Sequence, residues 1–444
     1  MLDLYFDLMY NKNIQYERMF VSVRNNDSLN ILEMFAGVGG FRVGLERANK
    51  DFFVTKWSNQ WEPAKKAQHA FDCYDTHFKD SENLNVDIAT VPDEFFKKNK
   101  IDLIVGGFPC QDYSVARSLS GELGIQGKKG VLFWEIVRAI ELSKPKYALL
   151  ENVDRLLKSP SKQRGRDFSI MLGALNDLGY SVEWRVINAA EYGFAQRRRR
   201  VFIFVYRNDD EFYNSQNNYN DEEIIFSKGL FAQEFPVEDY AVKNRFSTGE
   251  LPSDLVELSD TYSAQIFNTG IMRNGQFTSI QTEPKFVSPI TLGEILVDED
   301  IVDEKYYLTN AQIEKFEYLK GAKKVKRTST TGHEYIFSEG GMPLTDPLDR
   351  PGRTMLTSES TVNRSTHVVD VNGRKRFLTP VECERLNGFP DDWTNMMPNR
   401  MRYFCMGNAL VTHIIERIGN RIEKIHNNNQ VNSLKNATNK TFNI

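Results

Sequence analysis

The feature that most constrains this chain is a short run in which an apolar segment leads into glycines, a proline and a cysteine. Residues 101–105 are mostly apolar and strand-like, and Gly106, Gly107, Pro109 and Cys110 follow directly. Glycines at a strand end let the backbone approach a ligand closely, and proline fixes the backbone before the thiol. The run therefore predicts an α/β sheet with a thiol at the carboxyl end of a strand, where such sheets keep their active sites. On this run alone, a small buried cysteine is the more common alternative.

A second segment is typical of the beginning of an α/β domain. Residues 29–35 are predicted to form a strand, residues 36–40 a glycine-rich turn and residues 41–47 a helix. This order is typical of nucleotide-binding α/β domains, in which glycines bring the backbone near a ligand at a helix N-terminus. The glycine spacing does not favour a dinucleotide. A purely structural tight turn is the alternative.

Two later positions suit the recognition of an adenosine group. A predicted strand over residues 54–58 is followed by Gln60 and Trp61, where nucleotide folds carry a polar group for the ribose and where an aromatic ring can flank the base. Asp87 follows another short loop and could bind an adenine amino group. Each of these residues, taken alone, is more often a surface or core residue.

Charged residues mark two further strand ends. The apolar strand 147–150 ends in Glu151, where partial burial raises the pKa of a carboxyl group and suits it to proton transfer. Four arginines at 197–200 precede another apolar strand, and alternation sends Arg198 and Arg200 to the same side. That pair can hold a carboxylate or phosphate. A solvated basic patch is the alternative.

Composition limits the classes of function. The 444 residues suffice for two domains, and the net charge of -4 means that any nucleic-acid surface must be local. The four cysteines are widely spaced, which favours a reduced intracellular protein without a disulfide framework or zinc site. No apolar run approaches the roughly 18 residues of a membrane span. The polar, glycine-bearing run 111–130 is long for a connection and predicts a lid over a site, with a disordered loop as the alternative.

Taken together, these segments resemble the DNA (cytosine-5) methyltransferases. The resemblance covers residues 29–206 and 350–420. Six motifs in the order of that family carry it, at 35–40, 107–111, 151–153, 196–200, 378–390 and 406–411. One motif could arise by chance, but six in order are specific.

The resemblance implies methyl transfer from S-adenosylmethionine to carbon 5 of cytosine within a short specific sequence of duplex DNA, with S-adenosylhomocysteine as product and no metal. Cys110 would attack carbon 6, Glu151 would bind ring nitrogen 3, and Arg198 and Arg200 would position the carboxylate and the base. The target base would be flipped out of the duplex. A tRNA cytosine-5 methyltransferase is the alternative, although the long stretch 207–349 argues against it.

The resemblance also assigns cofactor contacts, and two positions depart from the family pattern. The family usually has Glu where Gln60 stands, so either Gln60 binds the ribose less tightly or Glu62 replaces it. It usually has Ser where Ala409 stands, which leaves only the backbone for contact. The expected cofactor-binding residues are Phe35, Gly37, Val38, Gly39, Gly40, Gln60, Trp61, Asp87, Ile88, Pro109, Leu132 and Asn408.

The expected architecture is a mostly parallel, Rossmann-like methyltransferase sheet with a second, smaller target-recognition domain. The expected divisions are an N-terminal extension (1–28), the catalytic domain (29–206), the target-recognition domain (207–375), a return to the catalytic domain (376–426) and a disordered tail (427–444). Within the recognition domain, the expected linker spans 208–223, and candidate DNA contacts are Arg273, the basic run 315–327, Arg353, Thr357, Ser358, Asn363, Arg364 and Ser365.

The resemblance also implies the setting of the protein. We expect a bacterial, cytoplasmic monomer that meets duplex DNA at the nucleoid and has no membrane partner. A cognate restriction endonuclease, acting separately, is a further expected partner. The recognised DNA sequence does not follow from these residues, because base contacts depend on side-chain placement.

Overall fold

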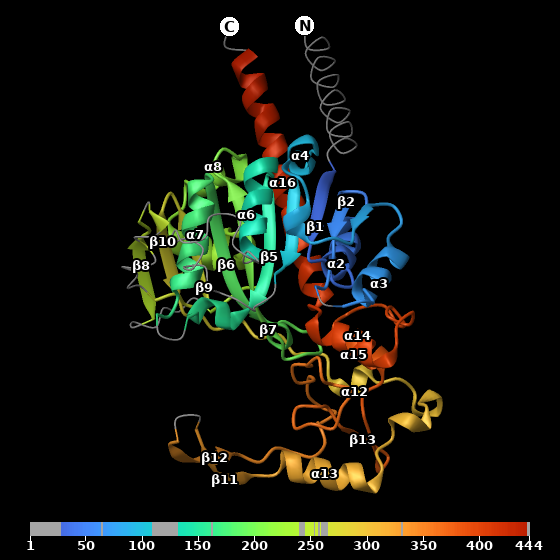
Figure 1. Ribbon diagram of the computed structural model, residues 1–444. Coiled ribbons are helices and arrows are strands. Elements are labelled where there is room, and N and C mark those ends of the chain that lie inside the picture. The colour runs from blue at the N-terminus through green and yellow to red at the C-terminus, as the bar shows by residue number, and fades with distance from the viewer. Residues whose placement is uncertain are drawn as a thin grey trace, which may run out of the picture.

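The computed structural model describes the chain in several stretches (Figure 1). They are residues 28–63, 65–108, 132–160, 163–238, 245–252, 254–255, 258, 265–329 and 332–441, with only the backbone described for 429–441. The expected N-terminal extension up to residue 27, Pro109, Cys110 and the expected lid over 111–130 lie outside the described residues.

A ten-stranded sheet forms the centre of the larger domain, in the order β3-β2-β1-β4-β5-β7-β6-β9-β10-β8. The strands are β1 Leu29–Met34, β2 Phe53–Asn59, β3 Glu82–Leu84, β4 Leu103–Gly107, β5 Tyr147–Val153, β6 Tyr180–Asn188, β7 Arg199–Arg207, β8 Phe246–Glu250, β9 Thr269–Arg273 and β10 Gln276–Ile280. The strands from β3 to β5 in this order run parallel, and each later pair is antiparallel. The predicted α/β class is confirmed, with a mixed sheet whose parallel half carries the glycine turn.

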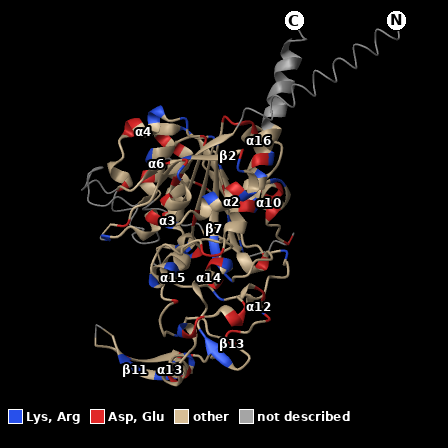
Figure 2. Ribbon diagram, turned by 90° about the vertical axis from the view of Figure 1, so that its right-hand side faces the viewer, with Lys and Arg blue, Asp and Glu red and all other residues tan. Residues whose placement is uncertain are grey.

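Helices cover both faces of this sheet (Figure 1). Those of the larger domain are α2 Gly40–Asn49, α3 His69–His77, α4 Asp93–Lys98, α6 Leu132–Ser143, α7 Arg166–Asp177, α8 Glu211–Gln216, α9 Asp221–Glu223, α10 Leu230–Glu234 and α16 Thr412–Thr441. Acidic and basic residues are interspersed along them (Figure 2), in keeping with the small net charge.

Alternation along the strands gives the sheet two apolar faces. Leu32 and Ile104 belong to one hydrophobic cluster, which includes side chains of α4, α6 and α7. Their neighbours Ile31 and Val105 belong to a second cluster, which includes side chains of α2, α8, α10 and α16. Because successive side chains of a strand point to opposite faces, such apolar strands need a helical layer on each side.

The boundary of the smaller domain differs from the expectation. The sequence predicts that this domain begins at 207, with a linker over 208–223. Instead, α8 and α10 pack in the second cluster through Phe212 and Phe231, and β9 pairs with β6. The strands β8–β10 therefore extend the large sheet, because their apolar side chains complete its core at Met272 and Phe277.

The smaller domain follows β10 and lies below the larger one in Figure 1. Its elements are α12 Leu292–Ile295, α13 Asn310–Lys320, β11 Lys323–Thr328, β12 Glu334–Glu339, β13 Val369–Val371 and β14 Arg374–Arg376. The chain then returns through α14 Pro380–Leu386 and α15 Asn399–Asn408 to the long helix α16.

Helix α16 extends into the stretch that is expected to form a disordered tail. It runs from Thr412 to Thr441, so most of the stretch 427–444 is helical in this structure. Neither glycine nor proline interrupts the sequence between 427 and 441, and such a stretch can continue a helix that is already anchored by tertiary packing. Within the described part of the chain, no helix combines the length and apolar character that crossing a membrane requires.

Candidate active site

The predicted site residues follow strands whose carboxyl ends are aligned in the sheet. Met34 at the end of β1 lies opposite both Asn59 of β2 and Gly106 of β4. Gly107, the last residue of β4, lies opposite Glu151 of β5. The segments that leave these strands therefore meet at one edge of the sheet, which is the edge at which open α/β sheets bind ligands.

The turn after β1 brings backbone groups to this edge. Phe35, Gly37 and Gly39 have φ angles of 55°, 57° and 89°, and α2 begins at Gly40. A left-handed backbone suits glycine but is uncommon for an aromatic residue, so Phe35 is held in place by its surroundings. The Gly37 N–H donates to Oε1 of Gln60 at 2.8 Å. The turn is thus tied to the residue that follows β2.

The apolar residues expected at the cofactor gather beside this turn. Ile88 and Phe108 belong to the first hydrophobic cluster, and Phe35 and Leu132 pack against it. Trp61 is 37% exposed, whereas Ile88 is buried. The expected residues Phe35, Trp61, Ile88 and Leu132 thus come from four separate segments of the chain.

The polar residues expected at the cofactor have local partners. One oxygen of Asp87 accepts a hydrogen bond from the Ala89 N–H at 3.1 Å. Asn408 is the last residue of α15 and is exposed. A side chain placed at Gly40 would lie 3.1 Å from Leu410, so the residues after Asn408 return to the glycine turn.

The two ribose candidates differ in their hydrogen bonding. The Oε1 atom of Gln60 is occupied by the Gly37 N–H. The Oε2 atom of Glu62 is buried and has no hydrogen-bond partner among the described residues. A buried acceptor without a partner costs free energy, so Glu62 retains an acceptor for a ligand hydroxyl.

Glu151 and Arg200 form an ion pair at the carboxyl end of β5. Arg200 Nε lies 2.9 Å from Oε1 of Glu151, and both side chains are largely buried. Burial raises the pKa of Glu151, an effect that Arg200 and Arg198 partly offset. A Cβ at Gly107 would lie 3.3 Å from Oε2 of Glu151, so a residue without a side chain leaves room for this carboxyl group.

The predicted alternation of the arginines is confirmed. Arg198 is buried, whereas Arg199 is exposed and pairs with Asp154 at 3.3 Å. Arg198 donates to the carbonyl oxygens of Met355 at 3.3 Å and Gly407 at 3.0 Å. Burial, followed by repulsion from Arg200, lowers the pKa of Arg198 to about 9. Arg198 therefore joins the arginine segment to two distant segments, while Arg200 is the direct partner of Glu151.

Two site residues had no assigned role in the sequence analysis. The Asn152 side chain donates to the Phe108 carbonyl oxygen at 2.8 Å and thereby ties β5 to the segment that leads to Cys110. The Gln196 side chain donates to Asn387 Oδ1 at 3.1 Å and accepts from the Met355 N–H at 3.1 Å. Both residues lie within the recognised motifs, but nothing in the sequence pointed to their partners.

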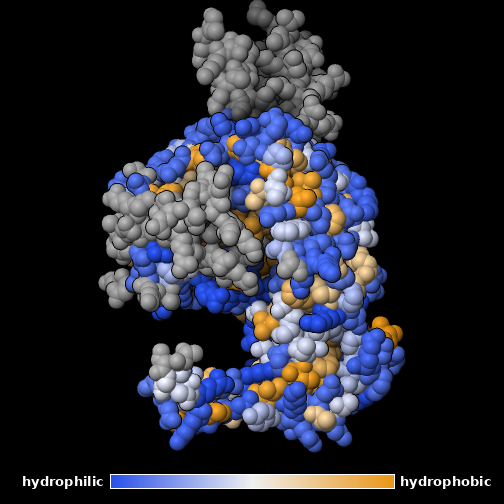
Figure 3. Space-filling model, viewed as in Figure 1, coloured by the Kyte–Doolittle hydropathy of each residue, from blue (hydrophilic) through white to orange (hydrophobic). Residues whose placement is uncertain are grey.

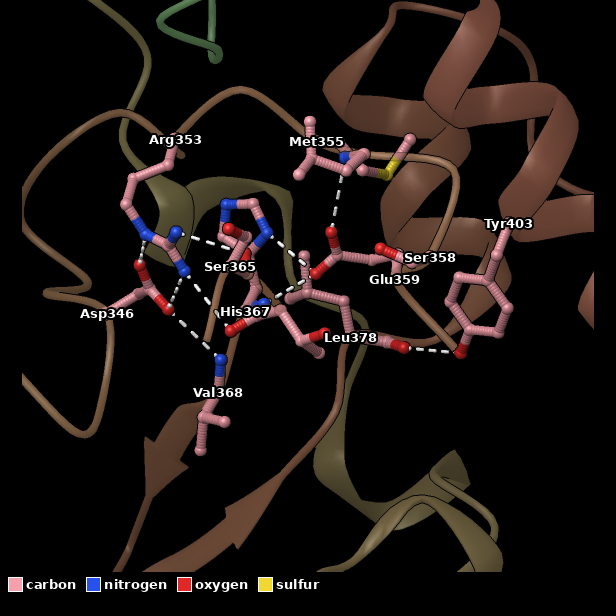
Figure 4. Close-up of polar contacts among 12 residues, drawn as sticks. Asp346, Arg353, Met355, Ser358, Glu359, Ser365, His367, Val368, Leu378 and Tyr403 are labelled. Carbon is pink, nitrogen blue, oxygen red and sulfur yellow. Dashed lines mark hydrogen bonds and ion pairs between the residues drawn. The ribbon is translucent and has the colours of Figure 1, made fainter. Parts of the chain in front are cut away.

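Several residues that are expected to contact DNA also have partners within the protein (Figure 4). Arg353 pairs with Asp346 and donates to the Ser365 carbonyl oxygen at 3.0 Å. His367 Nδ1 lies 2.8 Å from Oε1 of Glu359, and both residues are buried. This buried cluster anchors the segment that contains Met355, because a charged group withdrawn from water needs such partners.

Two other arginines and one lysine also have internal partners. Arg364 pairs with Glu339 at 3.3 Å and donates to the Leu319 carbonyl oxygen at 2.7 Å. Arg273 pairs with Asp221 on the larger domain at 2.5 Å. Lys320, within the basic run, is buried and donates to the Leu344 carbonyl oxygen at 2.7 Å. These side chains therefore stabilise the protein itself, and the polar appearance of their segments did not distinguish this role from DNA contact.

Comparisons with known proteins agree with this geometry. Residues 29–424 match the family model described as C-5 cytosine-specific DNA methylase. The chain is 60% identical over 399 residues to Type II methyltransferase M.Sau3AI of Staphylococcus aureus, with 90% of this chain and 96% of that protein covered. It is 26% identical over 394 residues to Type II methyltransferase M.HhaI of Haemophilus parahaemolyticus, with coverages of 89% and 94%.

Solved structures show the same fold. The S. pombe Dnmt2 methyltransferase matches with a TM-score of 0.56 at 13% identity, covering 90% of this chain and 99% of that one. The Entamoeba histolytica methyltransferase EhMeth matches with a TM-score of 0.53 at 13% identity, with coverages of 89% and 98%. From the family match over almost the whole chain and the close Type II relative, this chain belongs to the C-5 cytosine-specific DNA methylase family and is a DNA (cytosine-5) methyltransferase.

Proposed function

We propose that the chain methylates cytosine within one short sequence of duplex DNA by flipping the target base and attacking it with Cys110. The observation that carries this proposal is the ion pair of Glu151 with Arg200, beside the strand from which the chain leads to Cys110. A duplex hides the cytosine ring, so the base must leave the stack before a side chain can reach carbon 6.

The catalytic residues have separate tasks. The Cys110 thiolate adds to carbon 6, and the resulting enamine places electron density on carbon 5. Glu151 meets ring nitrogen 3 and shares the proton that offsets the charge on the ring, a task that its raised pKa favours. Arg200 orients Glu151, and Arg198 adds positive charge that stabilises a thiolate nearby. Departure of the carbon 5 proton and then of the thiolate restores the aromatic ring.

Enzymes of this family use S-adenosylmethionine, which supplies the methyl group as an electrophile on sulfur. The residues at the sheet edge fit such a group, because the glycine turn exposes backbone and apolar side chains lie beside it. We assign the adenosine to Phe35, Trp61, Ile88 and Leu132. Glu62 is the better ribose acceptor, since the Oε1 atom of Gln60 is already occupied. The remaining proposed contacts are Gly37, Val38, Gly39, Gly40, Asp87, Pro109 and Asn408.

The smaller domain is the proposed target-recognition domain. It lies opposite the edge of the sheet at which β5 ends, so DNA bound between the two domains would present a flipped base to Glu151 (Figure 1). The enzyme is proposed to act as a monomer. A separate restriction endonuclease of the same specificity is its expected counterpart, as the Type II relatives suggest.

Bisulfite sequencing of DNA from a methylation-free host that expresses this chain tests the proposal. We expect protected cytosine in one short sequence context. Cys110→Ser should abolish protection while S-adenosylhomocysteine still binds, as measured by calorimetry. Retained methylation by this variant would remove Cys110 from the mechanism. If the soluble wild-type protein protects no cytosine in DNA, the duplex-DNA substrate is wrong, and transfer RNA becomes the substrate to test.

A further inference from the structure

A two-stranded ribbon projects from the smaller domain. Strands β11 and β12 pair only with each other within the described sheets, and the ribbon extends away from α13 (Figure 1). Its side chains are unusually exposed, with 41% exposure for Val325, 43% for Tyr335 and 64% for Ile336. An isolated ribbon of two strands is marginally stable in water, and the high exposure of the apolar Ile336 side chain indicates a surface that a partner covers.

The pairing register divides the ribbon into two faces. Val325 lies opposite Phe337, and Arg327 lies opposite Tyr335, which places these four side chains on one face. The cations of this face are already engaged. The Arg327 guanidinium lies 3.9 Å from the centre of the Phe337 ring, and Lys323 on the same face donates to the Leu319 carbonyl oxygen at 3.1 Å.

The opposite face is open. It comprises Lys324, Lys326, Thr328, Glu334, Ile336 and Ser338, and we call it the open face. Both of its lysines are exposed, and neither forms an ion pair with a described residue. Ile336 lies directly opposite Lys326. The one acidic side chain of the open face, Glu334, is at the end of the ribbon away from Lys324. The open face therefore carries a net positive charge.

The base of the ribbon is firmly tied to the smaller domain. Glu339, at the end of β12, pairs with Arg364, which also donates to the Leu319 carbonyl oxygen at the end of α13. The adjacent Lys320 is buried. These contacts hold the ribbon across a hollow from the larger domain (Figure 3), on the side toward which the carboxyl end of β5 points.

From this arrangement we propose that the open face of the β11–β12 ribbon enters the major groove of the substrate DNA, with the lysines on phosphates and Ile336 against base edges. The proposal rests on the proposed function, because it assigns the specificity of the same enzyme to one face of one element. A two-stranded ribbon fits the width of the major groove, and the positive charge of the lysines complements the negative phosphates of DNA. Phosphate contacts position the ribbon on the duplex. An apolar side chain can distinguish one base pair from another by its contact with a thymine methyl group.

Binding of the full chain to duplex DNA at several salt concentrations tests the phosphate contacts. The probe is a fluorescent duplex that carries the sequence context found by bisulfite sequencing. The double variant Lys324→Ala with Lys326→Ala should weaken binding at least tenfold and reduce the slope of log affinity against log salt by about 0.9 for each lost contact. The matched control, Lys315→Ala with Arg327→Ala, removes the same charge from the same domain but not from the open face. Equal effects of both double variants would overturn the proposal.

Methylation specificity tests the role of Ile336. Ile336→Ala should relax the sequence context seen by bisulfite sequencing, while Tyr335→Ala on the other face should leave it unchanged. Calorimetric binding of S-adenosylhomocysteine shows that each variant is folded. An unchanged context in Ile336→Ala would overturn the contact with bases. These outcomes are distinct from failure of the proposed function, in which the wild-type chain itself protects no cytosine.

Discussion

The two inward arginines of the active site have different partners. Arg200 pairs directly with Glu151, whereas Arg198 donates to backbone carbonyls of Met355 and Gly407. Both add positive charge near the carboxyl group, but only Arg200 bonds to it. Replacement of Arg200 should therefore affect catalysis most directly, and replacement of Arg198 should also loosen the packing of the segments around it.

Glu151 gives a prediction for the rate and its pH dependence. Glu151→Gln should slow methyl transfer by about 10²- to 10⁴-fold, the usual range for loss of a general acid or base. Because the protonated carboxyl group is the active form, the wild-type rate should fall as pH rises through its raised pKa, and this fall should be absent in the variant. Single-turnover methylation assays measure both effects. The control Asp154→Asn removes the partner of the outward Arg199 and should change the rate only slightly. An unchanged rate in Glu151→Gln would remove this residue from the chemistry.

Glu33 gives a prediction for stability against pH. It is buried in β1, accepts from the Tyr74 hydroxyl at 2.9 Å, and burial raises its pKa from 4.5 to about 7. The folded protein thus holds this proton more tightly than the unfolded chain does. The stabilising contribution is complete below pH 4.5 and is lost as pH rises to about 7, a change of roughly 3 kcal/mol. Glu33→Gln should reduce the pH dependence of unfolding by urea across this range. If the free energy of unfolding changes with pH equally in the wild-type protein and in Glu33→Gln, then Glu33 does not titrate in this way.

At the scale of elements, the C-terminal helix α16 is held on the larger domain by its contact with α2. A Cβ at Gly44 would lie 2.5 Å from Ile415 Cβ and 2.5 Å from the Thr412 carbonyl oxygen. Helix α16 therefore lies directly against the backbone of α2. Close helix contact of this kind joins the first helix of the domain to the last, and it places Leu410 and the residues before it at the glycine turn.

Gly44→Ala should destabilise the protein. Alanine favours a helix over glycine by about 1 kcal/mol, but overpacking against backbone costs about 1–3 kcal/mol, so a net loss is expected. Gly340→Ala is the matched control, because a Cβ there would meet no atom within 4 Å. Urea unfolding compares the two. A Gly44→Ala protein as stable as the control would mean that α16 shifts away from α2 without loss.

At the scale of the whole molecule, one segment connects the smaller domain to the catalytic arginines. The Gly352 N–H donates to the Ala195 carbonyl oxygen, and the Arg197 N–H donates to that of Gly352, each at 2.8 Å. Met355 bonds to both Gln196 and Arg198. The same segment is anchored within the smaller domain by the Asp346, Arg353, Glu359 and His367 cluster (Figure 4).

Loss of the Glu359 carboxylate should loosen this connection. Glu359→Ala leaves buried His367 without its partner, and we expect a loss of about 3 kcal/mol in the free energy of unfolding. Glu304→Ala is the control, because Glu304 is 79% exposed in its pair with Arg374 and should contribute less than about 1 kcal/mol. Urea unfolding measures both, and hydrogen exchange over residues 352–368 should increase only in the first variant. Equal losses of unfolding free energy in the two variants would show that the buried pair of Glu359 and His367 does not anchor residues 352–368.

Features that depend on local order along the chain could be predicted before the fold was known. The glycine turn, the strand ends, Glu151 and the inward direction of Arg198 and Arg200 all follow from periodicity and turn chemistry over a few residues. The same local information supported the family resemblance, because its motifs are short.

Contacts between distant segments, in contrast, follow from the fold and from no local pattern. Arg198 bonds to Gly407, 209 positions away, and Arg273 pairs with Asp221. Strands β8–β10 joined the large sheet because their apolar faces complete its core, which no local pattern specified. A charged side chain has the same sequence signal whether it is paired inside the fold or free for DNA. Only the three-dimensional arrangement of its neighbours separates Arg364, which is engaged, from Lys326 on the open face.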